Sequence, residues 1–174
     1  MARQDCYDVS VTAFDSRQFR DVLGHVPTSV VVVTGIDSDG TPQGITIGSF
    51  VSVSLEPPLV GFLPGTQSKT WNSLKETGKF CVNVLAENQA EVCWRFAKES
   101  DDRFAGIEWA PSLNGAPAIA GSLAHIDCDL HSDALYGDHY FVVGLVTQLH
   151  TPTGVSPHAM AFYRGKVVEV AFPE

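Results

Sequence analysis

Residues 28–63 read TSVVVVTGIDSDGTPQGITIGSFVSVSLEPPLVGFL, and this stretch decides the fold class. The β-branched run at 30–34 is typical of a strand that is buried on both sides. An Asp-Gly pair then marks a hairpin-type turn, and the stretch at 43–54 predicts a second strand. A third, short strand follows at 59–63. Strands joined by such short turns favour a largely antiparallel sheet.

Strand and turn signals continue toward the C-terminus, with short helices between them. This pattern predicts a mainly β fold with short helices: an antiparallel β-barrel, closed or partly closed, with the helices on its rim. The chain fits one domain over 15–174 after an N-terminal leader at 1–14. In the first helix Phe19, Val22, Leu23 and Val26 share one face. Helices are predicted at about 16–26, 68–77 and 88–97, further strands at 80–85, 118–132, 139–150 and 162–170, and an irregular segment at 101–117.

The composition argues against several classes of protein. With 11 Lys and Arg against 20 Asp and Glu, the formal net charge is −9, which argues against a nucleic-acid binder and against an anionic membrane surface as partner. No window is apolar enough to span a membrane and the N-terminus lacks a secretory signal, so we expect a cytoplasmic protein. The four cysteines form no CxxC pair and are expected to be buried free thiols.

Familiar cofactor and catalytic signatures are missing from the sequence. There is no GxGxxG after a strand, no GxxxxGK[ST] loop and no GxSxG elbow. The six histidines form no HExxH or similar pair, so we expect no metal site. Any chemistry must therefore come from less familiar arrangements.

The segment at 44–58 is unusually polar for a buried strand, because it carries four hydroxyls and two glycines. Glycine lets a flat ligand approach the backbone, and hydroxyls with backbone N–H groups can hold phosphate or ribityl oxygens. An edge strand with a polar outer face explains the same composition equally well. The residue types alone do not distinguish a ligand-binding strand from an edge strand.

Two further stretches combine polar groups with a turn or a helix start. Ser68-Lys69-Thr70 begins a helix, where an anion can bind, although an ordinary cap with a solvated lysine is the simpler interpretation. Arg103 is a second candidate for a phosphate, or the partner of a neighbouring acid. Gly137-Asp138-His139 enters a strand, and its histidine could contact a nicotinamide or flavin edge. A tight turn with a surface histidine explains this motif more simply.

In their order and spacing, these segments resemble the short-chain flavin reductase family, the flavin-reductase-like FMN-binding split barrels. They look most similar to the reductase components of two-component flavin-dependent monooxygenases that act on phenols and steroid-derived phenols. The resemblance covers about residues 15–168. It is carried by FRDVLGHVPTSVVVVT, GITIGSFVSVSLEPPLV, the run from Ser68 through Trp71, GKFCVNVLA, Arg95-Phe96-Ala97, DRFAG and Gly137-Asp138-His139.

The resemblance implies a homodimeric split barrel that binds FMN or FAD and uses NADH or NADPH. The implied activity is hydride transfer from NAD(P)H to the flavin, with reduced flavin supplied to a separate oxygenase component. Two alternatives stay open: a flavoprotein that keeps its flavin and reduces another acceptor, and a non-catalytic flavin-binding module.

The resemblance also implies positions for the ligands. We expect His139 to orient the nicotinamide rather than to shuttle protons. Where this chain has Gly48, the family often has a small residue or serine, so the glycine is expected to loosen that wall of the flavin site. Where this chain has Thr28-Ser29, the family more usually has a small residue followed by glycine. The resemblance places the flavin against Thr28, Ser29, Val30, Thr46, Ser49, Phe50, Val51 and Ser52, and its phosphate near Ser52, Ser54, Ser68, Lys69 and Thr70. The same site is bordered by Asn83, Ala86 and Phe104. The nicotinamide is placed beside Gly137, Asp138 and His139, with Tyr163 as a further candidate for this pocket.

Overall fold

A computed structural model describes residues 13–100 and 102–171. Most of the predicted leader at 1–14, and Cys6 with it, lies outside the described residues. The helices are α1 (Ser16–Leu23), α2 (Lys69–Thr77), the 3₁₀ turn η2 (Glu87–Gln89) and α3 (Ala90–Ala97). The strands are β1 (Thr28–Ser29), β2 (Val31–Ile36), β3 (Pro42–Ile47), β4 (Val51–Ser54), β5 (Leu59–Phe62), β6 (Lys79–Val84), β7 (Trp109–Pro111), β8 (Pro117–Ile119), β9 (Ala124–Tyr136), β10 (His139–His150), β11 (Ala159–Tyr163) and β12 (Lys166–Val170).

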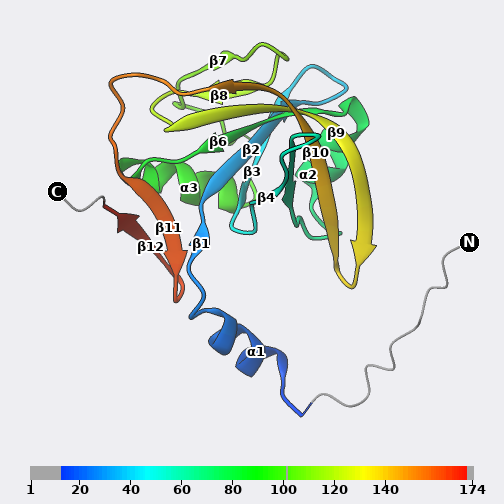
Figure 1. The fold of residues 1–174 in the computed structure, drawn as a ribbon, viewed down its shortest axis with the longest axis vertical. Coiled ribbons are helices and arrows are strands. Elements are labelled where there is room, and N and C mark those ends of the chain that lie inside the picture. Colours follow the sequence, from blue (N-terminus) through cyan, green and yellow to red (C-terminus); the bar gives the residue numbers. More distant parts are fainter. Residues whose placement is uncertain (1–12, 101, 172–174) are drawn as a thin grey trace, which may run out of the picture.

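The main sheet is antiparallel and curls on itself. Its seven strands follow the order β3-β2-β6-β9-β10-β5-β4, so β3 and β4 form opposite edges. A flat sheet with six gaps would be about 29 Å wide. Residues 48–50 alone join the two edges, and from one strand end to the next they span at most about 14 Å. The sheet must therefore bend into the open barrel seen in Figure 1, which confirms the predicted mainly β split-barrel architecture.

The predicted single strand at 43–54 is wrong, because the chain leaves one edge of the sheet there and joins the other. β3 pairs with β2, and β4 pairs with β5. A short sheet of β1, β11 and β12 lies beside this crossing. The Ser29 hydroxyl donates to the Phe50 carbonyl at 3.3 Å and ties β1 to the crossing.

Strand β2 separates two hydrophobic clusters, which confirms that the run at 30–34 is buried on both sides. Val31 and Val33 pack in one cluster with Phe62, Trp71 and Phe80. The alternate residues face a second cluster, whose buried members are Val30, Val32, Leu85, Cys93, Phe96, Ile119 and Met160. Cys81, Cys93 and Cys128 are free and buried, as predicted.

Several predicted boundaries need correction. The predicted last strand is the hairpin β11–β12, which turns where Arg164 and Gly165 take positive φ angles of 49° and 78°. The segment at 101–117 contains strand β7, and α3 begins after Gln89 rather than with a cap at Asn88. Among the described residues, no helix is long and apolar enough to cross a membrane.

Helix α1 stands clear of the barrel (Figure 1). Asp15 caps it by accepting from two backbone N–H groups, and the helix ends at Leu23 rather than near Pro27. Its apolar face does not join the core, since Phe19, Val22, Leu23 and Val26 are all at least half exposed. The chain presents this face to its surroundings.

Candidate functional site

The loop between β5 and α2 gathers several of the polar groups that the sequence singles out. At its start, the Leu63 N–H donates to the Ser49 hydroxyl at 2.9 Å. Further along, the Thr66 N–H donates to the Asp138 carbonyl at 2.9 Å. The loop ends at the cap of α2. Residues 63–70, which we call the border segment, therefore connect the β3–β4 crossing, the β9–β10 turn and the start of α2.

The β9–β10 turn is held against the border segment from both sides of His139. Gly65 bridges to His139, and the Tyr140 N–H donates to the Pro64 carbonyl at 3.0 Å. Gly137 takes a φ of 61°, a left-handed conformation that favours glycine, at the tip of the turn. The turn therefore presents a fixed, partly exposed imidazole.

Asp138 orients the His139 ring. Its Oδ1 lies 2.8 Å from Nδ1, and this hydrogen bond from His139 is the main reason that the pKa of Asp138 is lowered from its ordinary value. Both side chains face solvent, with 47% of the His139 side chain and 93% of the Asp138 side chain exposed. The Nε2 edge of the ring remains available to a ligand.

The start of α2 has the chemical features that an anion site requires. Ser68 caps the helix by accepting from the Trp71 N–H at 3.2 Å, and the first-turn amides of Lys69 and Thr70 have no intrahelical acceptor. Arg103 lies beside them: its Nη1 donates to the Thr70 hydroxyl at 2.5 Å and to the Gly44 carbonyl at 2.8 Å. Helix amides and a guanidinium therefore lie close together, and Lys69 lines the cavity over them.

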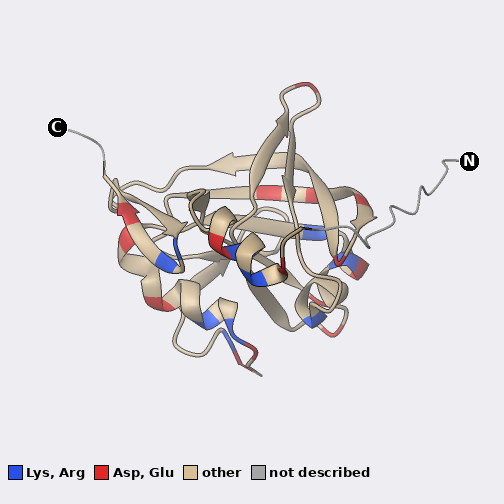
Figure 2. Cartoon of the chain, turned by 90° about the horizontal axis from the view of Figure 1, so that it is seen from below, with Lys and Arg blue, Asp and Glu red and all other residues tan. Residues whose placement is uncertain are grey.

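Among the described residues, Arg103 forms no ion pair with an acid; its sequence neighbour Asp101 lies outside them. Within residues 13–100 and 102–171, its hydrogen-bond partners are two carbonyls and one hydroxyl, and no carboxylate lies within ion-pair distance. Glu99 lines the same cavity but forms no ion pair with Arg103. In Figure 2 Lys and Arg are dispersed among Asp and Glu, so this cation acts locally rather than as part of a basic face.

A cavity of about 600 Å³ opens over this cluster. That volume is large for a phosphate alone and lies in the range of small-molecule sites. Polar groups of α2 and Arg103 share its wall with apolar side chains. The lining comprises Gln43, Ile45, Gln67, Ser68, Lys69, Thr70, Ser73, Phe96, Ala97, Glu99, Ser100 and Arg103.

The β3–β4 crossing carries other candidates, but two of their hydroxyls are engaged. The Thr46 hydroxyl donates to the Cys93 carbonyl at 2.7 Å, and that of Ser29 donates to Phe50. A β-carbon on Gly48 would lie 3.1 Å from the Thr28 hydroxyl oxygen. Thr28 therefore lies close to Gly48, and a larger residue at this exposed position would have to displace its hydroxyl.

Three candidates belong to the core rather than to an open surface. Val30 packs in the second cluster, and Asn83 and Ala86 have no exposed surface. The Asn83 amide donates to the Val32 carbonyl at 3.0 Å and accepts from the Ile119 N–H at 2.7 Å. Its amide joins three strands, so this buried side chain is not available to contact a ligand.

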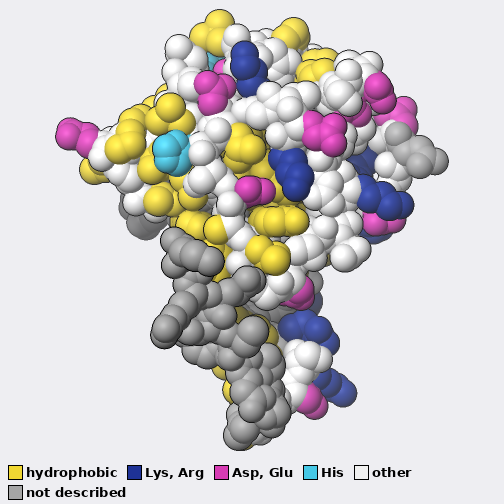
Figure 3. Space-filling model, turned by 90° about the vertical axis from the view of Figure 1, so that its right-hand side faces the viewer, with side chains coloured by type: hydrophobic (Ala, Val, Ile, Leu, Met, Phe, Trp, Pro, Cys, Tyr) yellow, Lys and Arg dark blue, Asp and Glu magenta, His cyan; other side chains and the backbone are white. Residues whose placement is uncertain are grey.

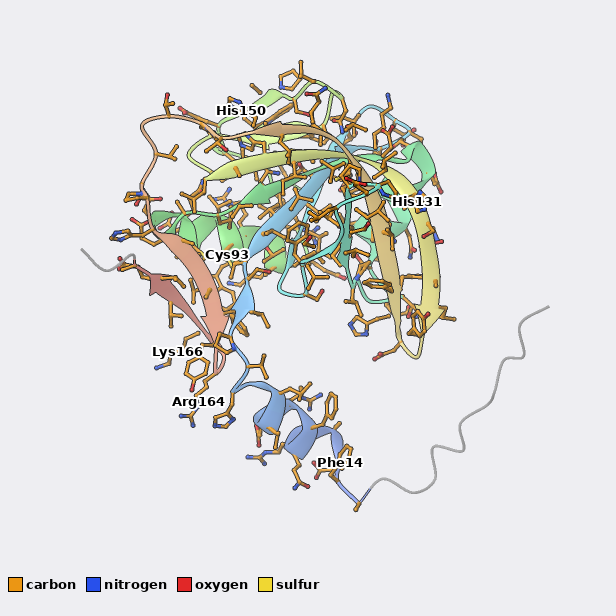
Figure 4. The ribbon with its side chains drawn as sticks, viewed as in Figure 1. Phe14, Cys93, His131, His150, Arg164 and Lys166 are labelled. Atoms are coloured by element: carbon orange, nitrogen blue, oxygen red, sulfur yellow. The ribbon has the colours of Figure 1, made fainter. Side chains whose placement is uncertain are left out.

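The remaining candidates are spread more widely. Val51 and Ser52 are exposed on the edge strand β4, and Ser54 is half-buried. Phe104 packs edge-on against Phe96, with ring centroids 4.9 Å apart. Tyr163 lies at the end of the β11–β12 hairpin, next to the labelled Arg164 and Lys166 in Figure 4.

The curled antiparallel sheet is that of a split β-barrel, and its border carries helix amides, a guanidinium and an oriented imidazole. The chain belongs to the family described as "Flavin reductase like domain", which matches residues 23–171. The predicted membership, and with it a flavin- and NAD(P)H-using oxidoreductase, is confirmed.

Relatives agree with this assignment. A flavin reductase from Pseudomonas putida is 50% identical over 154 residues, 88% of this chain and 89% of the relative. The reductase subunit HsaB of a flavin-dependent monooxygenase from Rhodococcus jostii is 47% identical over 158 residues, 91% and 80% of the two chains. The structure of the NADH:FAD oxidoreductase SgcE6 from Streptomyces globisporus, solved with NAD and FAD fragments, has a TM-score of 0.83 at 36% identity and covers 90% of this chain and 93% of that one.

Proposed function

We propose that this protein reduces a diffusible flavin with NAD(P)H and passes the reduced flavin to a separate oxygenase component. One observation carries the proposal: the border segment physically joins the anion site at α2 to the imidazole at the β9–β10 turn. A ligand with a phosphate at one end and a reactive ring at the other fits that arrangement. The monooxygenase reductase HsaB, at 47% identity, supports the oxygenase as partner.

The residues of this chain would bind and align rather than perform acid–base chemistry. The α2 amides, Lys69 and Arg103 would hold the flavin phosphate. His139, kept in place by Asp138, would orient the nicotinamide at the other end. The bound cofactors themselves supply the hydride transfer, which depends mainly on the alignment of their rings.

Replacement of His139 tests this division of labour. We expect His139→Ala to raise the KM for NADH about tenfold or more while the affinity for flavin changes little, because the ring lies at the nicotinamide end. His131→Ala, an exposed histidine on β9, is the matched control. Unchanged NADH kinetics in the His139 variant would contradict the assigned role.

A homodimer is part of the proposal. The exposed apolar face of α1 supports it, since an exposed face of that kind is typical of an interaction surface. Hydrophobic side chains are also exposed on the side that bears the β9–β10 hairpin (Figure 3), including Leu135 and Tyr136 of β9. A cytoplasmic location stays a prediction.

A further inference from the structure

Two side chains of α2 reach the part of the chain that carries His139. The Asn72 side-chain amide donates to the Thr66 carbonyl of the border segment at 3.1 Å. Three residues further along the helix, the Lys75 ammonium lies over the ring of Tyr140, 4.9 Å from its centroid. Residues three apart share one face of a helix. One face of α2 therefore holds both the border segment and the first residues of β10.

The first of these connections is a series of hydrogen bonds that leads from Asn72 to the imidazole. Asn72 holds the Thr66 carbonyl, and the Thr66 N–H donates to the Asp138 carbonyl at 2.9 Å. The Asp138 carboxylate in turn lies 2.8 Å from Nδ1 of His139. Since the side chains of Asp138 and His139 both face solvent, the orientation of the imidazole depends on how firmly the turn is held from behind.

The second connection is a cation–π contact. Tyr140 follows His139 directly in β10, and its backbone N–H donates to the Pro64 carbonyl at 3.0 Å. Tyr140 and Lys75 are both half-buried. A partly desolvated ammonium is attracted to the negative face of a tyrosine ring. Lys75 therefore holds the residue next to the imidazole in place.

Helix α2 is itself fixed in the core. Trp71 and Leu74 are buried, and the indole packs edge-on against Phe62 of β5, with ring centroids 5.1 Å apart. The first turn of the same helix carries the amides that are proposed to hold the flavin phosphate. One rigid element therefore sets the place of the phosphate and, through Asn72 and Lys75, the place of the imidazole.

We propose that Asn72 and Lys75 are positioning residues, which hold His139 at a fixed place relative to the phosphate end of the flavin. The inference rests on the role proposed for His139, and neither side chain needs to touch a cofactor. Hydride transfer depends on the alignment of the two rings, and a displacement of about 1 Å can cost about a hundredfold in rate. Loss of either contact should therefore impair the use of NADH and leave flavin binding nearly unchanged.

A double-mutant cycle tests whether Asn72 acts through His139. Steady-state oxidation of NADH would be measured at saturating FMN or FAD for the full-length wild type, Asn72→Ala, His139→Ala and the double variant. We expect Asn72→Ala to raise the KM for NADH about fivefold when His139 is present, and less than about twofold when it is already alanine. The KM for flavin should change less than about twofold. A purely structural role of Asn72 would give the same factor in both backgrounds and would overturn the proposal.

Substitutions of Lys75 test the second connection with little risk to the fold, because this side chain is only half-buried. Lys75→Met keeps the length of the side chain but removes the charge, and is expected to raise the KM for NADH about threefold. Lys75→Arg keeps a cation over the Tyr140 ring and should stay within about twofold of the wild type. Glu76→Gln, exposed on the same helix, changes the net charge equally and should leave the kinetics unchanged. Equal effects of Met and Arg at position 75, or an equal effect of the control, would contradict the assignment.

The His139→Ala variant separates a failure of the positioning proposal from a failure of the role proposed for His139. If His139→Ala raises the KM for NADH and neither the Asn72 nor the Lys75 substitution does so, the positioning proposal alone is overturned. If His139→Ala leaves NADH kinetics unchanged, the role of His139 is wrong, and the positioning proposal is refuted with it.

Discussion

Asn83 has no surface exposed to solvent, and its amide holds three strands together. Besides its bonds to the Val32 carbonyl and the Ile119 N–H, it donates to the Thr34 hydroxyl at 2.9 Å. Thr34 in turn donates to the Pro117 carbonyl at 2.5 Å. Such a network fixes the approach of β8 to β2 and β6, because every polar group that it satisfies is buried.

Removal of this amide should therefore destabilise the fold. We expect Asn83→Ala to lower the free energy of unfolding by about 2–4 kcal/mol, since it leaves several buried partners unpaired. Urea denaturation of the variant, compared with the exposed Asn88→Ala, measures the effect. Equal stability of the two variants would show that the network does not have this role.

For single residues, the sequence predicts the kind of interaction that a side chain makes better than it predicts where in the fold that side chain lies. Ser68, Gly78 and Asp15 cap helices as their residue types indicate. Asn83 could not be placed from sequence, because a polar residue in a strand is equally compatible with a ligand contact and with a buried network. For Arg103, the structure was needed to show that its hydrogen-bond partners among the described residues are two carbonyls and a hydroxyl.

At the scale of elements, helix α3 packs closely on β3 through Gly44. A β-carbon at Gly44 would lie 2.6 Å from the Phe96 ring. The flat group that approaches this glycine is thus a side chain of the protein itself. We expect Gly44→Ala to cost about 1–3 kcal/mol of stability, and less in a Phe96→Leu background.

Thermal unfolding of the single and double variants measures that coupling. Gly65→Ala is a suitable control, because its added β-carbon would have no neighbour closer than 4.0 Å. Independent effects of the Gly44 and Phe96 substitutions would mean that the helix does not press on the strand at this point.

The turn between β2 and β3 depends on an ionised carboxylate. Asp37 accepts from the backbone of Thr41 at 2.8 Å and Asp39 at 3.0 Å, and from the Gln43 amide at 3.0 Å. These hydrogen bonds lower the pKa of Asp37 from its ordinary value, and the bond from Thr41 has the largest effect. The stabilisation is present above the unfolded pKa of about 3.9 and is lost as the pH falls through the lower folded pKa.

Comparison of the wild type with Asp37→Asn across acidic pH tests this element. The wild type should be the more stable at pH 7, and the difference in melting temperature should shrink below about pH 4 as its carboxyl becomes protonated. A difference that stays constant or grows toward acid would contradict the assignment.

The break between β3 and β4 could not be predicted from the properties of single strands. Residues 44–54 have strand character throughout, and both halves do form strands. The interruption at 48–50 arises because the sheet closes there, edge toward edge. That is a property of seven strands together and leaves little trace in the local sequence.

At the scale of the whole molecule, the exposed face of α1 predicts self-association. We expect the double substitution Phe19→Asp and Val22→Asp to convert a dimer to a monomer in light scattering after size exclusion, because it places charges on the apolar face. Arg17→Asp on the same helix should leave the dimer intact. A dimer that persists with both charges on the face would show that α1 is not at the interface.

The barrel class could be predicted from strand runs and turns, and candidate site residues could be named from the order of motifs. The arrangement that makes them a site could not, because it depends on the loop at 63–70 bonding to a turn about seventy residues away in the chain. A groove formed by the β7–β8 hairpin and the neighbouring ends of β9 and β10 could not be predicted from the sequence either, because its residues come from four separate segments.

Flavin-dependent oxidation of NADH by the purified protein tests the central claim most directly. Loss of NADH absorbance would be followed with no flavin, with FMN and with FAD. The account predicts oxidation that requires added flavin and saturates with it. A yellow protein that oxidises NADH without free flavin would contradict the diffusible-flavin proposal, and no oxidation with either flavin and either nicotinamide would contradict the reductase activity itself.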